Sequence, residues 1–202
     1  MHPVMFAAFD RLCRRRGAGG RVLEIGALPG PDSLLNLPAL EGATAKVGLS
    51  LDGPYRTADF EILQGNANAM AWFADASFDA VLCNSVLEHD PRFWLTLAEI
   101  RRVARAGALI AIGVPGYGAR RLPLFGAALG RLRGVPVIGP ALHRRFEWLS
   151  AAVPTLGPHD FPGDYYRFSA PAMAEILLAG LRDVEVAELM QPPRILGSGV
   201  KP

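Results

Sequence analysis

Small and polar residues follow two apolar runs of this chain, and their types suit the binding of a ligand. The first run lies in Arg21–Gly30 (RVLEIGALPG) and ends in a loop bracketed by Gly26 and Gly30. The second lies in Asp79–Asp90 (DAVLCNSVLEHD) and ends in polar residues. Glycine has no Cβ, so the backbone can turn sharply there and approach a ligand closely. Because ligands bind beyond the carboxyl ends of strands in an open parallel sheet, the two runs predict one cleft.

Two histidines are candidates for a general base at such a cleft. His89 follows the second run, and His159 opens a polar and aromatic segment farther along the chain. An unperturbed histidine pKa near 6.5 suits proton transfer at neutral pH, and a positioned base accelerates a reaction by about 10²–10⁴-fold. For His89 the alternative is a hydrogen bond at the start of a helix, which would shape the pocket without moving a proton.

The segment that begins at His159 could also bind a hydroxylated ligand. It reads HDFPGDYYRF, and its candidate substrate-binding residues are Asp160, Tyr165, Tyr166 and Arg167. The alternative is a packing loop whose aromatic and arginine side chains hold the next helix, with Ser169 as its N-cap. The residue types alone leave both interpretations open.

Strands and helices that alternate along the chain would position these residues. Apolar runs alternate with helical patterns after the glycine-rich break at 17–20, which indicates a βαβ sheet. The expected strands are Arg21–Ile25, Lys46–Leu49, Glu61–Gln64, Asp79–Asn84, Ala108–Val114, Asp183–Leu189 and Arg194–Ser198. The expected helices are an amphipathic one within 1–16, Pro91–Arg105 and Ala170–Ala179. Three prolines at 29, 31 and 38 predict that any helix after the first strand is short.

At 202 residues, the chain is predicted to be one domain spanning residues 1–202. Residues 116–158 read as a long insertion after the fifth strand, and we expect a lid or substrate cap there. The alternative is a surface excursion that only packs for stability. Arg131 and Arg133 interrupt its apolar centre, which argues against a membrane span of about 20 apolar residues. Its arginines suit an anionic ligand or a solvated face equally well.

Composition excludes several classes of protein. The net charge of +2 is too small to indicate a nucleic-acid partner by itself, and no RNA-binding module is visible. Cys13 and Cys83 lie in a helical and a strand pattern, so we expect no disulfide and a cytoplasmic location. The N-terminus lacks the charged and apolar regions of a signal peptide. No metal site is predicted.

An ordered series of motifs gives this chain a family resemblance. Glu24–Gly30 is followed by Gly65–Met70, by Asn84–His89 (NSVLEH) and by Arg102–Ala108 (RVARAGA). From Arg21 to Val114, the series resembles the class I S-adenosylmethionine-dependent methyltransferases of the type 11 kind. The resemblance implies a Rossmann-like α/β fold with a seven-stranded, mostly parallel sheet, helices on both faces and an antiparallel last strand.

The resemblance also implies which residues hold S-adenosylmethionine. Glu24 would anchor the ammonium group, Ser50 or Asp52 the ribose hydroxyls, and Asn66 the adenine amino group. The full predicted set is Glu24, Gly26, Ala27, Gly30, Ser50, Leu51, Asp52, Asn66, Ala67, Asn84, Ser85 and Val86. The chain departs from the family in having no glycine at 27 or 28, and in having Ser50 and Asn66 where an acid is usual.

The resemblance implies methyl transfer to an oxygen or nitrogen of a small molecule or glycan precursor. The glycan interpretation depends on an overall likeness to methyltransferases of bacterial surface-polysaccharide clusters. One alternative is a protein that binds S-adenosylmethionine without transferring the methyl group. A second is a nucleotide-dependent oxidoreductase or epimerase, although the chain lacks the GxGxxG fingerprint. A third is an assembly subunit that docks through the 116–158 insertion.

Overall fold

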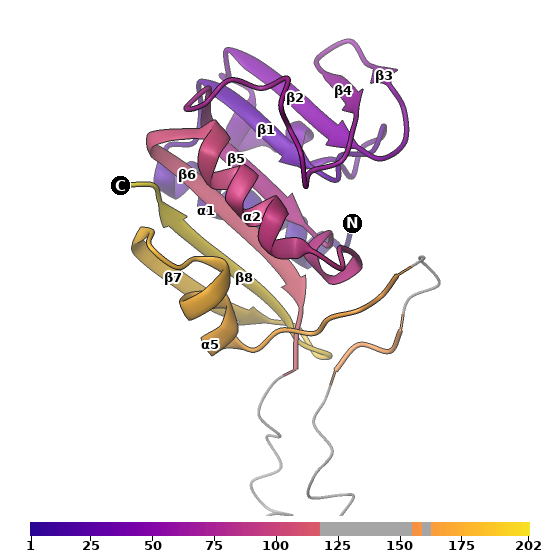
Figure 1. The fold of residues 1–202 in the computed structure, drawn as a ribbon, viewed down its shortest axis with the longest axis vertical. Coiled ribbons are helices and arrows are strands. Elements are labelled where there is room, and N and C mark those ends of the chain that lie inside the picture. The colour runs from indigo at the N-terminus through magenta and orange to yellow at the C-terminus, as the bar shows by residue number, and fades with distance from the viewer. Residues whose placement is uncertain (118–154, 159–162) are drawn as a thin grey trace, which may run out of the picture.

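One sheet lies between helices in the computed structural model, which describes residues 1–117, 155–158 and 163–202. Helix α1 (Pro3–Arg16) covers one face of the sheet, and α2 (Phe93–Val103) covers the other. The short helix α5 (Ala170–Ala172) continues into the π-helical turn η4 (Met173–Leu177) on the same face as α2 (Figure 1). The predicted α/β fold with helices on both faces is therefore confirmed.

The sheet has eight strands in the order β3-β4-β2-β1-β5-β6-β8-β7. Their bounds are β1 Arg21–Ile25, β2 Ala45–Ser50, β3 Tyr55–Arg56, β4 Glu61–Gln64, β5 Phe78–Asn84, β6 Ala104–Pro115, β7 Arg182–Leu189 and β8 Arg194–Val200. Strands β4, β2, β1, β5 and β6 are parallel neighbours. Strand β8 lies antiparallel between β6 and β7, which confirms the prediction for the last strand.

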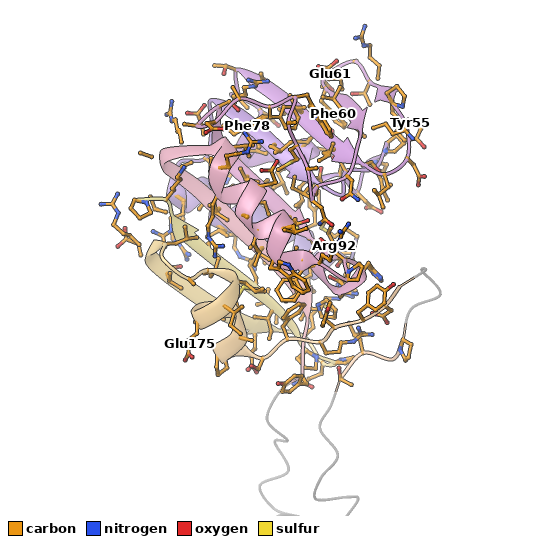
Figure 2. The ribbon with its side chains drawn as sticks, in the orientation of Figure 1. Tyr55, Phe60, Glu61, Phe78, Arg92 and Glu175 are labelled. Carbon is orange, nitrogen blue, oxygen red and sulfur yellow. The ribbon has the colours of Figure 1, made fainter. Side chains whose placement is uncertain are left out.

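The prediction of seven strands was one short. The additional strand, β3, has two residues, Tyr55 and Arg56, and pairs antiparallel with β4 at the sheet edge. Figure 2 shows Tyr55 at this edge, near Phe60 and Glu61 of the turn and strand that follow. A strand of two exposed residues has no apolar alternation, so the sequence pattern could not reveal it.

The helix bounds also differ from those expected. Helix α2 begins at Phe93 rather than Pro91, because Asp90 Oδ1 accepts a hydrogen bond from the Arg92 amide (2.8 Å) and forms a turn before the helix. It ends at Val103, since β6 already begins at Ala104. The helix expected over Ala170–Ala179 is α-helical only for its first three residues.

Only two 3-10 turns, η1 (Leu34–Asn36) and η2 (Pro38–Leu40), occur between β1 and β2. This agrees with the effect expected of the three prolines. The loop after β1 is therefore not followed by a regular helix that could fix its position, so side chains from neighbouring elements must hold that loop.

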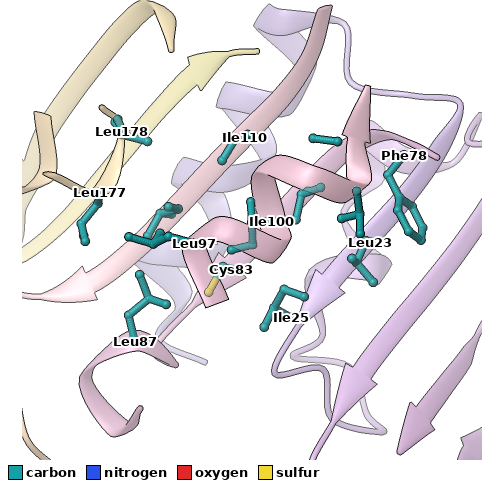
Figure 3. Close-up of a cluster of buried hydrophobic side chains, with 14 of the residues drawn as sticks. Leu23, Ile25, Phe78, Cys83, Leu87, Leu97, Ile100, Ile110, Leu177 and Leu178 are labelled. Atoms are coloured by element: carbon teal, nitrogen blue, oxygen red, sulfur yellow. The ribbon is translucent and has the colours of Figure 1, made fainter. Parts of the chain in front are cut away.

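Two apolar clusters fix the sheet between its helices. Alternate residues of β5 serve the two faces: Val81 and Cys83 pack toward α2, whereas Leu82 packs toward α1. Figure 3 shows Leu97 and Ile100 of α2 over Leu23, Ile25 and Cys83. Met5 and Phe9 of α1 fill the opposite cluster. The strand ends therefore project from a buried framework.

The predicted insertion, 116–158, lies largely outside the described residues. Its described ends come together beyond β6: Gly116 forms a bridge with Phe168, and Tyr117 forms one with Thr155. Within the described part of the chain, no helix has both the length and the apolar character needed to cross a membrane.

Candidate functional site

The carboxyl ends of four parallel strands bring the predicted cofactor-binding residues to one edge of the sheet. Ile25 at the end of β1 lies beside Leu49 of β2 and Cys83 of β5. Ser50 at the end of β2 lies beside Gln64 of β4. The loops that follow these strands are therefore neighbours, as a ligand cleft at this edge requires.

The glycine loop after β1 packs against both neighbouring strands. The amides of Gly26 and Ala27 donate hydrogen bonds to the carbonyl of Leu49 (2.8 and 3.1 Å). Gly26 has a φ of +78°, and a Cβ on it would overlap Val86 Cγ2, so only glycine fits here. Gly30 also has a positive φ (+144°), but apart from its chain neighbours no atom of the described residues lies within 4 Å of where its Cβ would be. The loop is anchored at Gly26 and open at Gly30.

Glu24 in β1 holds the far side of this loop. Its side chain is only 4 % exposed and accepts hydrogen bonds from Ser33 Oγ (2.5 Å) and from the amides of Leu34 (3.1 Å) and Leu35 (3.3 Å). Burial raises the pKa of Glu24, and these three hydrogen bonds oppose that rise. Both carboxylate oxygens thus already fix the start of η1, and an ammonium-binding role for Glu24 stays a prediction.

The end of β2 presents one exposed acid. Ser50 is nearly buried, and its Oγ accepts a hydrogen bond from the Asp52 amide (3.3 Å). Asp52 is exposed, and its carboxylate makes no hydrogen bond or ion pair within the described residues. Leu51, between them, is 65 % exposed. Of the two predicted ribose acceptors, Asp52 therefore has the free carboxylate.

The loop after β4 carries Asn66 and Ala67 next to a half-exposed indole. Asn66 Oδ1 accepts a hydrogen bond from the Asn68 amide (2.9 Å), which forms a tight turn and leaves that oxygen one further lone pair. Trp72 packs on Gly65, where a Cβ would overlap its ring. Sequence reasoning missed Trp72; a glycine at the strand end with an aromatic residue nearby was the available signal.

These residues fit S-adenosylmethionine by the chemistry of their groups. Leu28, Leu51 and Trp72 are large apolar side chains exposed at the ends of three adjacent strands, which suits a base and an aliphatic chain. The Asp52 carboxylate suits ribose hydroxyls, and the Asn66 amide suits an adenine edge. No cluster of three histidine, cysteine or acidic side chains that could hold a metal ion occurs in the described residues.

The exit of β5 forms a small polar cluster with the start of β8. Ser85 has a positive φ (+55°), and its Oγ accepts hydrogen bonds from Asn84 Nδ2 (3.2 Å) and Arg194 Nη1 (3.1 Å). Asn84 Oδ1 is buried and has no hydrogen-bond partner among the described residues. Arg194 was not predicted, because it reaches this cluster only through the antiparallel pairing of β8 with β6.

Glu88 is a second residue that sequence reasoning missed as a site residue. It is fully buried, and neither carboxylate oxygen accepts a hydrogen bond from another described residue. Burial raises the pKa of Glu88 to about 7, against its own amide and the charges of Arg194 and Arg167. Native proteins seldom keep a buried carboxyl without a hydrogen bond, and such groups concentrate at functional sites.

His89 lies beside Glu88, with Nε2 4.0 Å from Glu88 Oε1. It ends the 3-10 turn η3 (Leu87–His89), and its amide donates a hydrogen bond to the Val86 carbonyl (2.9 Å). This backbone contact does not involve the imidazole, so both interpretations of His89 stay predictions. The other candidates, His159 and Asp160, lie outside the described residues.

The Gly163–Phe168 loop docks on the β5 exit. The amides of Tyr165 and Tyr166 donate to the Glu88 carbonyl (2.7 and 3.2 Å), and the Tyr166 hydroxyl donates to the Pro91 carbonyl (3.1 Å). Arg167 forms an ion pair with Asp164 and donates to the carbonyls of Leu156 and Gly157. Tyr166 and Arg167 make the contacts of a packing loop, and Ser169 caps α5 as that alternative expects. Tyr165 is 56 % exposed and is the member of the loop that faces solvent.

Comparison with known proteins gives a family match over the strands that build this edge. The sequence model of a family described as a methyltransferase domain matches residues 38–112, which is less than half of the chain. No curated protein sequence is a significant match.

Solved structures share the fold. A phosphoethanolamine N-methyltransferase 2 from Haemonchus contortus has a TM-score of 0.62 at 16% identity, over 97% of this chain and 52% of that one. A 1,6-didemethyltoxoflavin-N1-methyltransferase from Burkholderia thailandensis has a TM-score of 0.64 at 17% identity, over 97% and 77% of the two chains. An S-adenosylmethionine-dependent methyltransferase from Archaeoglobus fulgidus has a TM-score of 0.62 at 16% identity, over 98% and 93%. The chain thus spans about half the length of the Haemonchus protein and nearly all of the Archaeoglobus one.

Proposed function

We propose that this chain is a class I S-adenosylmethionine-dependent methyltransferase that transfers a methyl group to an oxygen or nitrogen of a small molecule. The observation that carries this proposal is the edge formed by β4, β2, β1 and β5, where the glycine loop, Asp52 and Asn66 follow neighbouring strands. S-Adenosylmethionine, when bound, supplies a methyl group on a positively charged sulfur.

The chain's own residues would bind and orient the two reactants. Asp52 and Asn66 would hold the ribose and the adenine, while Leu51 and Trp72 offer apolar faces to the base. The open end of the glycine loop at Gly30 leaves room for the amino-acid portion. Much of the rate of a methyl transfer can come from alignment of the reactants, so positioning is the first task of this site.

The acceptor would lie on the β5 side of the edge. Ser85, Glu88 and Arg194 gather there, and exposed Tyr165 lies on the loop docked over them. A small-molecule acceptor is supported by two neighbours, whose structures contain phosphomonomethylethanolamine and 1,6-didemethyltoxoflavin. A glycan precursor is a finer version of the same proposal. The 116–158 insertion would cap the acceptor, which is supported by its described ends meeting beyond β6.

A cytoplasmic location is part of this proposal. It is supported by the two cysteines, Cys13 and Cys83, which are both buried and unpaired, as expected of a protein in a reducing compartment.

Calorimetric titration with S-adenosylmethionine, S-adenosylhomocysteine and NAD tests the proposal. We expect the first two to bind and NAD not to bind. Asp52→Asn should weaken binding about tenfold, because a hydrogen bond to a charged group contributes about 1.5–3 kcal/mol. Asp59→Asn, a matched exposed acid on the β3–β4 turn, should leave the affinity unchanged.

A screen of labelled methyl acceptors then separates transfer from binding alone. Formation of S-adenosylhomocysteine that depends on an added acceptor would support the enzyme. Tight binding without product across hydroxyl and amine acceptors would favour the binding-protein alternative. Binding of NAD in place of the methyl donor would overturn the proposal in favour of the oxidoreductase alternative.

A further inference from the structure

A chain of hydrogen bonds connects the loop after β4 to the exit of β5. Asn68 Nδ2 donates to Asp90 Oδ2 (2.6 Å) and to Thr96 Oγ1 (2.8 Å). Thr96 Oγ1 in turn donates to Asp90 Oδ2 (2.7 Å), and Asp90 Oδ1 accepts from the Arg92 amide (2.8 Å). Asp90 therefore accepts three hydrogen bonds, from a loop, a helix and the turn before that helix.

The same helix holds the rest of the loop farther along. The Met70 amide donates to Glu99 Oε2 (2.5 Å), and Arg102 donates to the carbonyls of Met70 (2.9 Å) and Phe73 (2.8 Å). Thr96, Glu99 and Arg102 are spaced three residues apart, so they lie along one face of α2. This face fixes the loop along its length.

The hydrogen bonds of Asp90 differ from those of Glu99 and Arg102, because they join two parts of the candidate site, the loop after β4 and the exit of β5. Asn68 closes the turn at Asn66, the predicted adenine reader, and Asp90 follows Glu88 and His89 on the acceptor side. Thr96 is 1 % exposed, whereas Asn68 and Asp90 are partly buried, so the junction is partly shielded from water. Charge-assisted hydrogen bonds in such a setting are short and hold their partners in one geometry.

We propose that Asp90 is a positioning residue that, through Asn68 and Thr96, fixes the Asn66–Asn68 turn to the β5 exit. Adenine recognition and acceptor placement are then set by one junction. The adenine part of this inference rests on the proposed function. A turn that is already fixed loses little conformational freedom when a ligand binds, so the junction strengthens the binding of adenine-containing ligands.

Exchanging the two partners tests this junction directly. Asp90→Asn should break it, because an amide in place of the carboxylate cannot accept all three donors. Asn68→Asp should break it by placing two carboxylates together. The double variant Asn68→Asp/Asp90→Asn restores an amide–carboxylate pair in reverse, and the Thr96 hydroxyl can accept as well as donate. Thr96→Val and Thr96→Ser form a matched pair that removes or keeps the hydroxyl.

Two readouts on the full chain distinguish positioning from general stability. In the free protein, we expect both single variants to speed amide hydrogen exchange about tenfold over 65–70 and 84–90, with the double variant near wild type. The dissociation constant for S-adenosylhomocysteine should rise about tenfold, equivalent to about 1.4 kcal/mol, in each single variant and recover in the double variant. Thr96→Ser should resemble wild type and Thr96→Val the single variants. Melting temperatures measured alongside identify any variant that has lost its fold.

Unchanged exchange in the 84–90 segment of folded single variants would overturn the junction. So would a double variant that is no better than the singles. Wild-type protein that fails to bind S-adenosylhomocysteine would instead overturn the proposed function, and with it the adenine part of the inference. Exchange in the free protein would still decide whether Asp90 couples the two segments.

Discussion

Glu24 at the end of β1 and Glu88 just beyond β5 are both buried glutamates at the same edge of the sheet, but their surroundings differ. Glu24 accepts three hydrogen bonds, all from Ser33–Leu35 in the connection that follows its own strand. Glu88 accepts none from another described residue, although Arg194 and Arg167 are near enough to lower its pKa. Burial raises the pKa of both groups.

The difference separates a carboxylate whose hydrogen bonds stabilise the fold from one whose oxygens accept no hydrogen bond from another described residue. The prolines prevent a regular helix after β1, and Glu24 holds this connection instead, because its carboxylate accepts hydrogen bonds from the donors at the start of η1. The Glu88 side chain makes no comparable set of hydrogen bonds with the described residues. Its backbone carbonyl, in contrast, accepts hydrogen bonds from the amides of Tyr165 and Tyr166. A buried carboxyl that accepts no hydrogen bond from another described residue opposes folding, and such groups concentrate at functional sites.

Removal of the Glu24 carboxylate should have the largest effect. Glu24→Ala leaves the Ser33 hydroxyl and the buried Leu34 amide without an acceptor, and leaves the Leu35 amide with Ser33 Oγ alone, so we expect a loss of about 3–5 kcal/mol in the free energy of unfolding. Urea unfolding followed by circular dichroism measures this loss. Glu41→Ala, an exposed glutamate after η2, is the control and should change stability little. Equal effects of the two substitutions would remove the contrast between Glu24 and an ordinary surface acid.

Replacement of Glu88 should stabilise the protein, and only at higher pH. Its pKa is raised from 4.5 to about 7 in the fold, so the folded state keeps a proton that the unfolded state has lost between these values. Glu88 therefore makes the protein less stable as pH rises from about 4.5 to 7, by up to about 3 kcal/mol. Glu88→Gln should remove this dependence and unfold at higher urea concentration than wild type at pH 8.

The same urea series at pH 4 supplies the control for Glu88→Gln, because the Glu88 carboxyl is then largely protonated in both the folded and the unfolded wild-type protein. The two proteins should have similar stability there. A Glu88→Gln variant that is less stable than wild type at pH 8 would mean that the Glu88 carboxylate has partners, and the contrast with Glu24 would fail.

Loss of a single donor should sharpen the description of Glu24. Ser33→Ala removes one of its three hydrogen bonds and also the Ser33 Oγ acceptor of the Leu35 amide, so we expect a loss of about 1–2 kcal/mol, below that of Glu24→Ala. It should also raise the pKa of Glu24 further, because the Ser33 hydrogen bond favours the ionised form. Urea unfolding at pH 5 and pH 8 measures both effects. Stability unchanged at either pH would show that the Ser33 hydroxyl does not support Glu24.

Arg194→Met should have the smallest effect, and it acts on Glu88. The positive charge of Arg194 lowers the pKa of Glu88 in the folded state, so its removal should extend the pH-dependent loss of stability to higher pH. Wild-type and Arg194→Met unfolding curves at several values between pH 5 and pH 8 would reveal the shift. A shift toward lower pH would contradict the assignment of Arg194 as a neighbour of Glu88.

The order of the main strands could be predicted from sequence because buried parallel strands are apolar runs and the motifs that follow them occur in a fixed order. Strand β3 could not, since Tyr55 and Arg56 are exposed. The glycine loop was expected, but the contact between Gly26 and Val86 depends on the sheet order. Glu88 stood within a recognised motif, yet its surroundings include Arg194 and the Gly163–Phe168 loop, which are distant in sequence.

The interpretation of Tyr166 and Arg167 shows the same limit. Their residue types suit ligand binding and packing alike, and their partners, the carbonyls of Pro91 and Leu156, are seen only in the fold. Asp90 illustrates it again, because its hydrogen bonds with Asn68 cross from one connection to another. Local patterns predict elements, whereas the polar contacts between elements need the fold.

Hydrogen exchange of the full chain with and without S-adenosylhomocysteine tests the central claim most directly. We predict slower exchange on binding in 26–30, 50–52 and 65–70, the loops after β1, β2 and β4. Protection confined to the pocket of about 210 Å³ between α1 and β7–β8, which Arg11 and Ser198 line, would contradict the claim that the cofactor binds at the carboxyl edge.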